Sequence, residues 1–275
     1  MPELPEVETI ARGLAKRVRG DVVESVWIGK RRQPLKSRPA EIVRVLEGSR
    51  IAAVRRVGKH IVFDLEGARD GSPAERREQW IVHLGMTGRV LVAGAGDEVA
   101  RHTHAIVRLR SGRELRYVDP RMFGKLSVVR GEGFAAAGHE PLEVEFAGFA
   151  TLFRGRKTPI KSALLNQKLL SGIGNIYADE SLARAGVRPR RRAARVTQPE
   201  LRRLYDAMRQ VLAEAIAAGG SSVSDYVDAD GERGFFQLEH RVYGREGEPC
   251  RVCQTEIRRI VIAGRSSHYC PNCQK

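Results

Sequence analysis

The sequence predicts a multidomain α+β protein: an N-terminal β-sandwich with flanking helices, a helical domain, and a C-terminal hairpin that carries cysteines. Three observations lead to this prediction. Short segments rich in β-branched residues fill the chain from about residue 22 to residue 130. Apolar residues recur at helical spacing after about residue 148. All four cysteines lie in the last 26 residues, which suggests a separate small module.

The first predicted element is a helix near the N-terminus. Its apolar residues recur at helical spacing: Leu4, Val7, Ile10, Ala11, Leu14 and Val18. Pro5 suits the first helical turn, and Glu3, Glu6 and Glu8 complement the positive end of the helix dipole. Gly20 is expected to end this helix.

Eight segments after this helix are predicted to be strands, because β-branched residues dominate them and turn residues separate several of them. They cover residues 22–28, 50–57, 60–65, 80–84, 89–93, 104–110, 114–119 and 125–130. Many short strands at regular spacing favour an antiparallel sandwich or barrel. The polar stretch 67–79 is expected to form a long exposed hairpin loop.

The second half of the chain is predicted to be helical. Helices are expected from Thr158 or Pro159 to Gln167 and from Asn175 to Ala185. Thr197 and Glu200 form a capping-box pattern that opens a third, amphipathic helix, which Gly219-Gly220 ends. The Gly- and Pro-containing run 131–148 before these helices is typical of a linker between domains.

A run of arginines follows the second of these helices: Arg188, Arg190, Arg191, Arg192 and Arg195. Such a run can bind nucleic-acid phosphates, or it can be a solvated loop. Both interpretations stay open from the sequence.

The overall charge favours a polyanionic partner. Lys and Arg outnumber Asp and Glu by 48 to 33, so the net charge is +15 and the isoelectric point about 10.2. Nucleic acid is the simplest such partner, and a general basic bias of the source proteome is the alternative. No apolar run approaches the ~20 residues of a membrane helix, and the acidic start MPELPEVETI is unlike a signal peptide. We therefore expect a cytoplasmic protein.

The cysteines predict a metal site: Cys250, Cys253, Cys270 and Cys273 form the pattern C-x2-C-x16-C-x2-C. Four thiolates at this spacing can close a tetrahedral zinc site, and a site with four protein ligands is structural because no position is open for substrate. Two short strands around Ala263-Gly264 are expected between the pairs, with Arg265 at the hairpin tip.

The N-terminus offers a candidate nucleophile. Removal of Met1 would expose the secondary amine of Pro2, and an α-amino group has a pKa near ~8, so part of it is neutral at pH 7. A neutral amine can attack the anomeric carbon of a sugar to form an iminium, and Glu3 beside it can shuttle protons. The alternative is that Pro2 is simply a structural residue before a helix.

Several motifs together resemble the formamidopyrimidine-DNA glycosylase family of bacterial type. In the family's order they are MPELPEVE (1–8), RRVGKH (55–60), HLGMTG (83–88), DPRMFG (119–124), IGNIYADESL (173–182), VYGREGEPC (242–250) and the zinc-finger cysteines. The resemblance spans the whole chain. It implies a catalytic β-sandwich domain (1–133), a linker (134–148), a helix–two-turn–helix DNA-binding domain (149–236) and a zinc finger (240–275), with DNA held between the domains.

The resemblance also implies the chemistry. The family members are bifunctional: they flip out and excise oxidised purines such as 8-oxoguanine and formamidopyrimidines, then cleave the strand by β,δ-elimination. Pro2 would form an imine with C1′ of the sugar, and Glu3 would be the acid/base that helps to open the ring. Lys59 would aid excision and elimination, and Arg265 would clamp phosphates and support the second elimination.

The implied partner is damaged double-stranded DNA, bound by a monomer. Met86, Arg121 and Phe123, hereafter the wedge residues, match the family residues that fill the hole left by the flipped base. The implied phosphate contacts are His102, Lys157, Lys161 and Asn175. Asn175 opens a helix after Ser-Gly-Ile-Gly (171–174), so backbone amides there can bind an anion.

The loop 221–236 is implied to cover the flipped base, with Ser222, Ser224 and Tyr226 as its recognition residues. Family members often have a basic residue where this chain has Ser224, which leaves the lesion preference open.

Two other functions stay open. One is a glycosylase for oxidised pyrimidines, similar to endonuclease VIII; Leu4 and the complete set of wedge residues favour the purine enzyme instead. The other is a zinc-ribbon protein that binds DNA without chemistry, and the presence of Pro2, Glu3 and Lys59 together argues against it.

Overall fold

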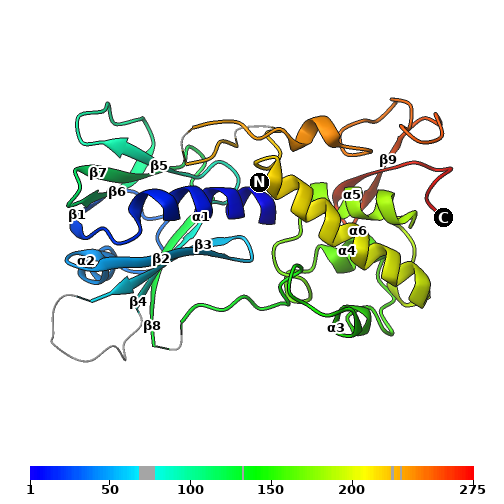
Figure 1. Cartoon of the computed structure of the whole chain (residues 1–275), viewed down its shortest axis with the longest axis horizontal. Helices are drawn as coiled ribbons and strands as arrows, with labels where there is room; N and C mark the ends of the chain where they lie inside the picture. Colours follow the sequence, from blue (N-terminus) through cyan, green and yellow to red (C-terminus); the bar gives the residue numbers. More distant parts are fainter. Residues whose placement is uncertain (68–77, 132, 224–225, 230) are drawn as a thin grey trace. The chain divides into compact units, whose positions relative to one another are not determined.

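The computed structural model describes residues 1–67, 78–131, 133–223, 226–229 and 231–275 (Figure 1). They form two compact units. Unit 1 comprises Met1–Ala135 and Gly219–Gly234, and unit 2 comprises Ala136–Ala218 and Phe235–Lys275. The chain thus returns to unit 1 for one short segment after it has formed most of the helices of unit 2.

Unit 1 is built on two antiparallel four-stranded sheets, with the strand orders β1-β6-β7-β5 and β2-β3-β4-β8. The strands are β1 (Val23–Ile28), β2 (Arg50–Val57), β3 (His60–Glu66), β4 (Glu78–His83), β5 (Arg89–Gly94), β6 (Thr103–Leu109), β7 (Arg113–Val118) and β8 (Lys125–Arg130). All eight predicted strands are confirmed. Because two separate sheets share one core, the fold is a sandwich. Residues 68–77 of the expected hairpin loop lie outside the described residues.

Two helices flank the sheets. The predicted N-terminal helix is α1 (Leu4–Val18), and it lies against β2 and β3. The second, α2 (Pro39–Leu46), lies against β1 and β4 and was not predicted. It buries Ile42, Val45 and Leu46, a face too short to stand out from the surrounding strand pattern.

The core of unit 1 includes the segment 219–234. Tyr226 and Ala229 belong to the same buried cluster as the apolar residues of both sheets, α1 and α2. The sequence analysis placed this segment in the helical domain up to residue 236. It packs in unit 1 instead, because its apolar side chains are buried there.

Unit 2 contains helices, two 3-10 turns and a hairpin. They are α3 (Phe146–Thr151), α4 (Ile160–Leu164), α5 (Asn175–Ala185), η1 (Ala193–Arg195), α6 (Gln198–Ala217), η2 (Phe236–Glu239), β9 (Arg258–Ile262) and β10 (Arg265–Tyr269). The predicted helices α5 and α6 are confirmed, and so is the capping box: the Thr197 N–H donates to the Glu200 carboxylate at 2.8 Å. Among the described helices, none has the length and apolar content that crossing a bilayer requires.

Two predictions for unit 2 were wrong in detail. The helix expected to reach Gln167 ends at Leu164, because the Gln167 side chain stabilises a turn: its amide donates to the Ile173 carbonyl at 2.8 Å and its oxygen accepts the Gly172 N–H at 2.9 Å. The run expected to be a linker as far as residue 148 already contains the start of α3, which buries Phe149.

The arginine run contains two residues with internal contacts, which neither interpretation expected, and three exposed residues. Arg191 forms an ion pair with Glu200 at 2.6 Å, and this contact lowers the pKa of Glu200 to about 2. Arg188 donates to the Pro271 carbonyl at 3.0 Å. These two arginines therefore hold unit 2 together, whereas Arg190, Arg192 and Arg195 are exposed.

Candidate active site and zinc centre

The N-terminus is fixed by the first turn of α1. Pro2 and Glu3 are buried, whereas Met1 is 45 % exposed. Glu3 is the N-cap of α1, and its backbone N–H donates to the Glu6 carboxylate at 2.8 Å as part of a capping box. An amine at Pro2 would therefore stand on a rigid support, which favours reaction with a bound sugar.

Glu6 also ties the predicted recognition loop to this turn. Its second oxygen accepts the backbone N–H of Ser221 at 2.8 Å, and Glu6 itself is 2 % exposed. Gly220 beside it has φ +84°, and a Cβ there would lie 3.0 Å from the Glu6 side chain, so glycine suits this approach. One buried carboxylate thus joins Glu3 and the loop.

The described recognition residues close the loop on itself. The Ser222 hydroxyl donates to the Tyr226 carbonyl at 3.1 Å and accepts the Gly234 N–H at 2.9 Å. The Tyr226 hydroxyl donates to the Gly219 carbonyl at 3.0 Å, and burial raises the pKa of Tyr226. Ser224 lies outside the described residues, so its effect on recognition stays a prediction.

Lys59 lies in the tight turn between β2 and β3. It is 8 % exposed although it stands at a hairpin tip. Arg56 holds this turn on α1: it forms an ion pair with Glu8 at 2.8 Å and donates to the Gly58 carbonyl at 3.2 Å. The α1 helix therefore supports both Pro2 and the turn that carries Lys59.

The structure presents the wedge residues on two loops of unit 1, 84–88 and 119–124. Met86 is 40 % and Phe123 50 % exposed, which is unusual for large apolar side chains in a folded core. The Arg121 guanidinium lies 4.7 Å from the centre of the Phe123 ring. The two loops thus expose both apolar and cationic side chains.

Asp119 organises these two loops. Its carboxylate accepts the Thr87 hydroxyl at 2.6 Å, the Gly124 N–H at 2.8 Å and the Tyr117 hydroxyl at 3.1 Å. It is fully buried, where such charge-assisted hydrogen bonds are strong. A Cβ on Gly85 would lie 2.5 Å from the Gly124 nitrogen, so the loops interlock too closely for a side chain there.

His83 lies at the base of the same loops, in β4. Its ring centre is 4.8 Å from that of His60, and its Nδ1 accepts the Gly85 N–H at 3.2 Å. Burial lowers the pKa of His83 to about 4, and the nearby cationic groups of His60, Lys59 and Lys125 act in the same direction. His83 is therefore neutral at pH 7.

This shift predicts an acid-sensitive unit 1. Unfolded His83 takes up a proton near its usual pKa of 6.5, whereas the folded residue does not until about pH 4. The stability is therefore complete above pH 6.5 and is lost as the pH falls toward 4, with about 2 kcal/mol lost between pH 7 and 5. Urea titrations at both pH values, followed by the fluorescence of Trp27 and Trp80, measure this. His83→Asn should weaken the pH dependence, and an equal dependence in both proteins would contradict the assignment.

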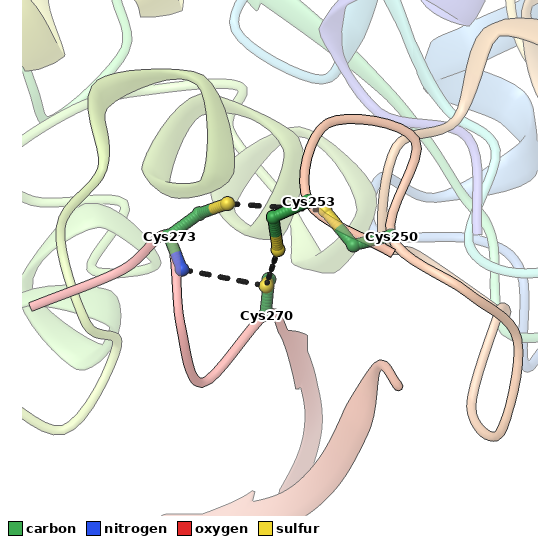
Figure 2. A group of neighbouring side chains, drawn as sticks. All are labelled: Cys250, Cys253, Cys270 and Cys273. Atoms are coloured by element: carbon green, nitrogen blue, oxygen red, sulfur yellow. Dashed lines mark hydrogen bonds between the residues drawn. The ribbon is translucent and has the colours of Figure 1, made fainter. Parts of the chain in front are cut away.

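The four cysteines form a zinc centre (Figure 2). Their sulfur atoms all lie within 4.8 Å of one another, with Cys253 and Cys270 3.4 Å apart and Cys250 and Cys273 3.9 Å apart. Sulfurs bound to one zinc ion at about 2.3 Å are expected to be about 3.8 Å apart. The predicted ligand set is thus confirmed, and it holds one structural Zn²⁺.

The residues predicted to contact phosphates differ in their exposure to solvent. Arg265 is exposed at the start of β10, after a turn in which Ala263 and Gly264 have φ +48° and +75°. His102 and Lys157 are also exposed. Asn175 is the first residue of α5, as predicted, and is partly buried, with its amide nitrogen 3.5 Å from the Ser266 hydroxyl.

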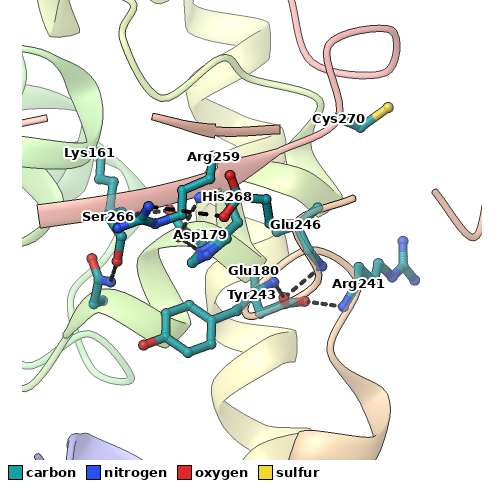
Figure 3. Close-up of polar contacts among 12 residues, drawn as sticks. Lys161, Asp179, Glu180, Arg241, Tyr243, Glu246, Arg259, Ser266, His268 and Cys270 are labelled. Carbon is teal, nitrogen blue, oxygen red and sulfur yellow. Dashed lines mark hydrogen bonds and ion pairs between the residues drawn. The ribbon is translucent and has the colours of Figure 1, made fainter. Parts of the chain in front are cut away.

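Lys161 is placed differently from the prediction. Its side chain is 1 % exposed, and its Nζ lies 2.7 Å from a carboxylate oxygen of Asp179 (Figure 3). An ammonium group that is buried and ion-paired in the protein cannot also contact a phosphate. We therefore correct its role from a DNA contact to an internal ion pair.

Sequence reasoning missed the carboxylates that organise these sites: Glu6, Asp119, Asp179 and Glu180. All four lie in the quoted motifs, but no role was assigned to them beyond the dipole role of Glu6. The one available signal was the occurrence of Asp179 and Glu180 inside an apolar helix pattern.

Three family models match the chain. They describe the formamidopyrimidine-DNA glycosylase N-terminal domain over residues 1–126, its H2TH domain over residues 137–227, and a zinc finger found in FPG and IleRS over residues 247–275. The chain is 46 % identical to the formamidopyrimidine-DNA glycosylase of Solibacter usitatus and 44 % identical to that of Gluconobacter oxydans, each over the full length of both chains.

Solved structures agree with these matches. The MutM (Fpg) protein of Thermus thermophilus superposes with a TM-score of 0.86 at 42 % identity, over 99 % of this chain and 98 % of that one. A Lactococcus lactis Fpg mutant in complex with Fapy-dG-containing DNA superposes with a TM-score of 0.88 at 31 % identity, over all of both chains.

Proposed function

The chain belongs to the formamidopyrimidine-DNA glycosylase family of base excision repair enzymes, and from this premise we propose that Pro2 attacks damaged nucleotides in double-stranded DNA. The substrates are oxidised purines, namely 8-oxoguanine and formamidopyrimidines. Excision of the base is followed by cleavage of the strand at the abasic sugar.

The first step makes a covalent intermediate. After Met1 is removed, the Pro2 nitrogen forms a bond to C1′ while the bond from C1′ to the base breaks, and the base leaves with the electron pair and takes up the proton that the Pro2 nitrogen loses. Glu3 donates a proton to the ring oxygen, which opens the sugar and leaves an iminium. Lys59 assists the excision and the β-elimination, and Arg265 assists the δ-elimination that leaves phosphate at both ends of the gap.

The DNA contacts come from both units. The wedge residues fill the space that the flipped base leaves, with Arg121 offering hydrogen bonds to the orphaned cytosine. His102, Lys157, Asn175 and Arg265 contact phosphates. Lys161 has no place among them because it is buried in an ion pair. The loop 221–236 covers the flipped base mainly through backbone amides.

One observation carries this proposal. Pro2 is buried on a capped helix turn, while Met1 in front of it is 45 % exposed and accessible for removal. The capping box of Glu3 and Glu6 fixes the backbone on which the Pro2 amine would lie once Met1 is removed. We also propose that the enzyme acts as a monomer in the cytoplasm, at the nucleoid.

Related structures define the substrates to test. Lactococcus lactis Fpg has been solved with Fapy-dG DNA, with abasic-site DNA and with DNA containing an oxidised pyrimidine. A lesion panel must therefore contain all three classes, because a pyrimidine preference would favour the endonuclease VIII-like alternative.

Borohydride trapping tests the proposal. Borohydride reduces an imine to a stable bond, so a covalent protein–DNA band is expected on a duplex with 8-oxoguanine opposite cytosine. A stronger band with an oxidised pyrimidine would favour the alternative enzyme. Mass spectrometry first shows that the protein lacks Met1. If this protein then gives no band with any lesion or with abasic DNA, the result would favour the alternative of a protein that binds DNA without chemistry.

Replacement of Arg121 by alanine tests the wedge. The guanidinium is expected to read the orphaned base, so Arg121→Ala should narrow the difference in excision rate between cytosine and adenine opposite the lesion by about tenfold. Overall affinity should fall less. Arg101→Ala, an exposed arginine with no proposed role, is the control. Equal losses with all four opposite bases would contradict the role.

A further inference from the structure

A buried charge cluster in unit 2 joins the zinc-finger module (240–275) to α5 (Figure 3). The side chains of Lys161 and Asp179, 2.7 Å apart, are 1 % and 0 % exposed. The other Asp179 oxygen accepts the backbone N–H of His268 at 2.9 Å. Lys161 also donates to the Ser266 carbonyl at 2.6 Å. Both members of the ion pair therefore bind the backbone of β10.

The neighbouring carboxylate binds the other half of the module. Glu180 is fully buried and accepts the backbone N–H groups of Arg241, Val242 and Tyr243 at 2.8, 3.0 and 2.8 Å. Two consecutive residues of α5 thus hold the segment before the first cysteine pair and the strand before the second. The zinc ion would hold the two cysteine pairs of the module together, and α5 orients the module.

Stability alone does not explain the Lys161–Asp179 pair. Burying two charges costs desolvation energy, and apolar replacements of such pairs are often as stable. The pair does provide directional contacts, and they converge on residues 266 and 268. These contacts fix the position of β10 against α5.

Two proposed phosphate contacts lie next to Ser266. Arg265 directly precedes Ser266 in β10, and the Asn175 amide nitrogen lies 3.5 Å from the Ser266 hydroxyl. We propose that Asp179 is a positioning residue for DNA binding: through Lys161 and the backbone of β10 it fixes the strand that begins at Arg265, so that the Arg265 guanidinium is held where it contacts a DNA phosphate. This inference rests on the phosphate contacts proposed above.

A double-mutant cycle tests the inference in the full-length zinc-loaded protein. The probe is a duplex with a tetrahydrofuran abasic analogue, and the readout is Kd against salt concentration. Arg265→Ala should lower affinity about tenfold and reduce the slope of log Kd against log salt by about 0.9, the value for one lost phosphate contact. Asp179→Asn should do the same, because an uncompensated Lys161 displaces β10. The double variant should show no further loss.

The outcomes separate the two proposals. Additive losses in the double variant, or a wild-type slope in Asp179→Asn with one zinc per chain, would overturn the positioning role alone. A wild-type slope and affinity in Arg265→Ala would refute the phosphate contact and the positioning role together. Borohydride trapping depends on Pro2 and judges the proposed chemistry independently.

Two further variants distinguish a loss of positioning from a loss of the fold of the module. If Asp179→Asn loses zinc, the charge-free pair Lys161→Met/Asp179→Leu leaves no unpaired buried charge. It should hold zinc and match the loss in Arg265→Ala, and a wild-type slope there would overturn the inference. Glu246→Gln is the matched control: Glu246 is an exposed carboxylate of the same module, 4.0 Å from Arg259, and its loss should leave Kd within about twofold.

Discussion

Enzyme with glycine in place of Pro2 is expected to excise 8-oxoguanine at least about 100-fold more slowly than wild type. Glycine retains an amine, but a primary one on a backbone that is free to rotate. The ring of Pro2 is buried and precedes the capped turn at Glu3, so we expect the ring to align the nitrogen for attack. Single-turnover excision and borohydride trapping on the same duplex measure both losses.

The matched control is Pro5→Ala. Pro5 is buried in the first turn of α1, three residues after Pro2, and has no proposed chemistry. It should stay within a few-fold of wild type. Wild-type turnover by Pro2→Gly would remove the nucleophile assignment. A similar loss in Pro5→Ala would show that the start of the helix, and not the amine, is what excision requires.

Replacement of Cys270 by serine is expected to abolish zinc binding and specific DNA binding. A structural zinc site contributes on the order of 10 kcal/mol to the fold of a small module, and the module has only a small apolar cluster of its own around Val242 and Ile257. Without the metal, β9 and β10 should unfold and Arg265 should lose its position. Metal analysis and a DNA-binding titration measure the two effects.

Val252→Ser is the control for this experiment. Val252 lies between the first two cysteines and is 71 % exposed, so its replacement should leave zinc and DNA binding unchanged. Full zinc content in Cys270→Ser would contradict the four-cysteine site. Zinc loss with normal DNA binding would show that the rest of the chain binds DNA without the module.

Much of the architecture was predictable from the sequence alone because it depends on local patterns. The eight strands, α1, α5 and α6 follow from residue periodicity and caps such as Thr197 with Glu200. The zinc ligands follow from spacing, since a C-x2-C turn places two sulfurs on one ion wherever it occurs. These features need no knowledge of distant contacts.

The motifs also identified the exposed wedge residues, but not what supports them. From the sequence alone, Asp119 is expected to lie at the surface, because aspartate residues are mostly exposed in folded proteins. In the structure it is fully buried, since Thr87 and Gly124 bring donors from two loops to one carboxylate. The shorter α4 and the unpredicted α2 likewise depend on contacts outside their own segments.

Only the tertiary structure decided which charged side chains are buried and connect distant segments of the chain. Glu6 accepts an N–H from Ser221, 215 residues later, and the Asp179 carboxylate pairs with Lys161 and with His268, 89 residues later. A buried charge is tolerated only when partners satisfy it. Those partners come together only in the folded chain. The sequence by itself therefore determined the local elements and the zinc ligands. The fold decided that Lys161 is buried and that segment 219–234 belongs to unit 1.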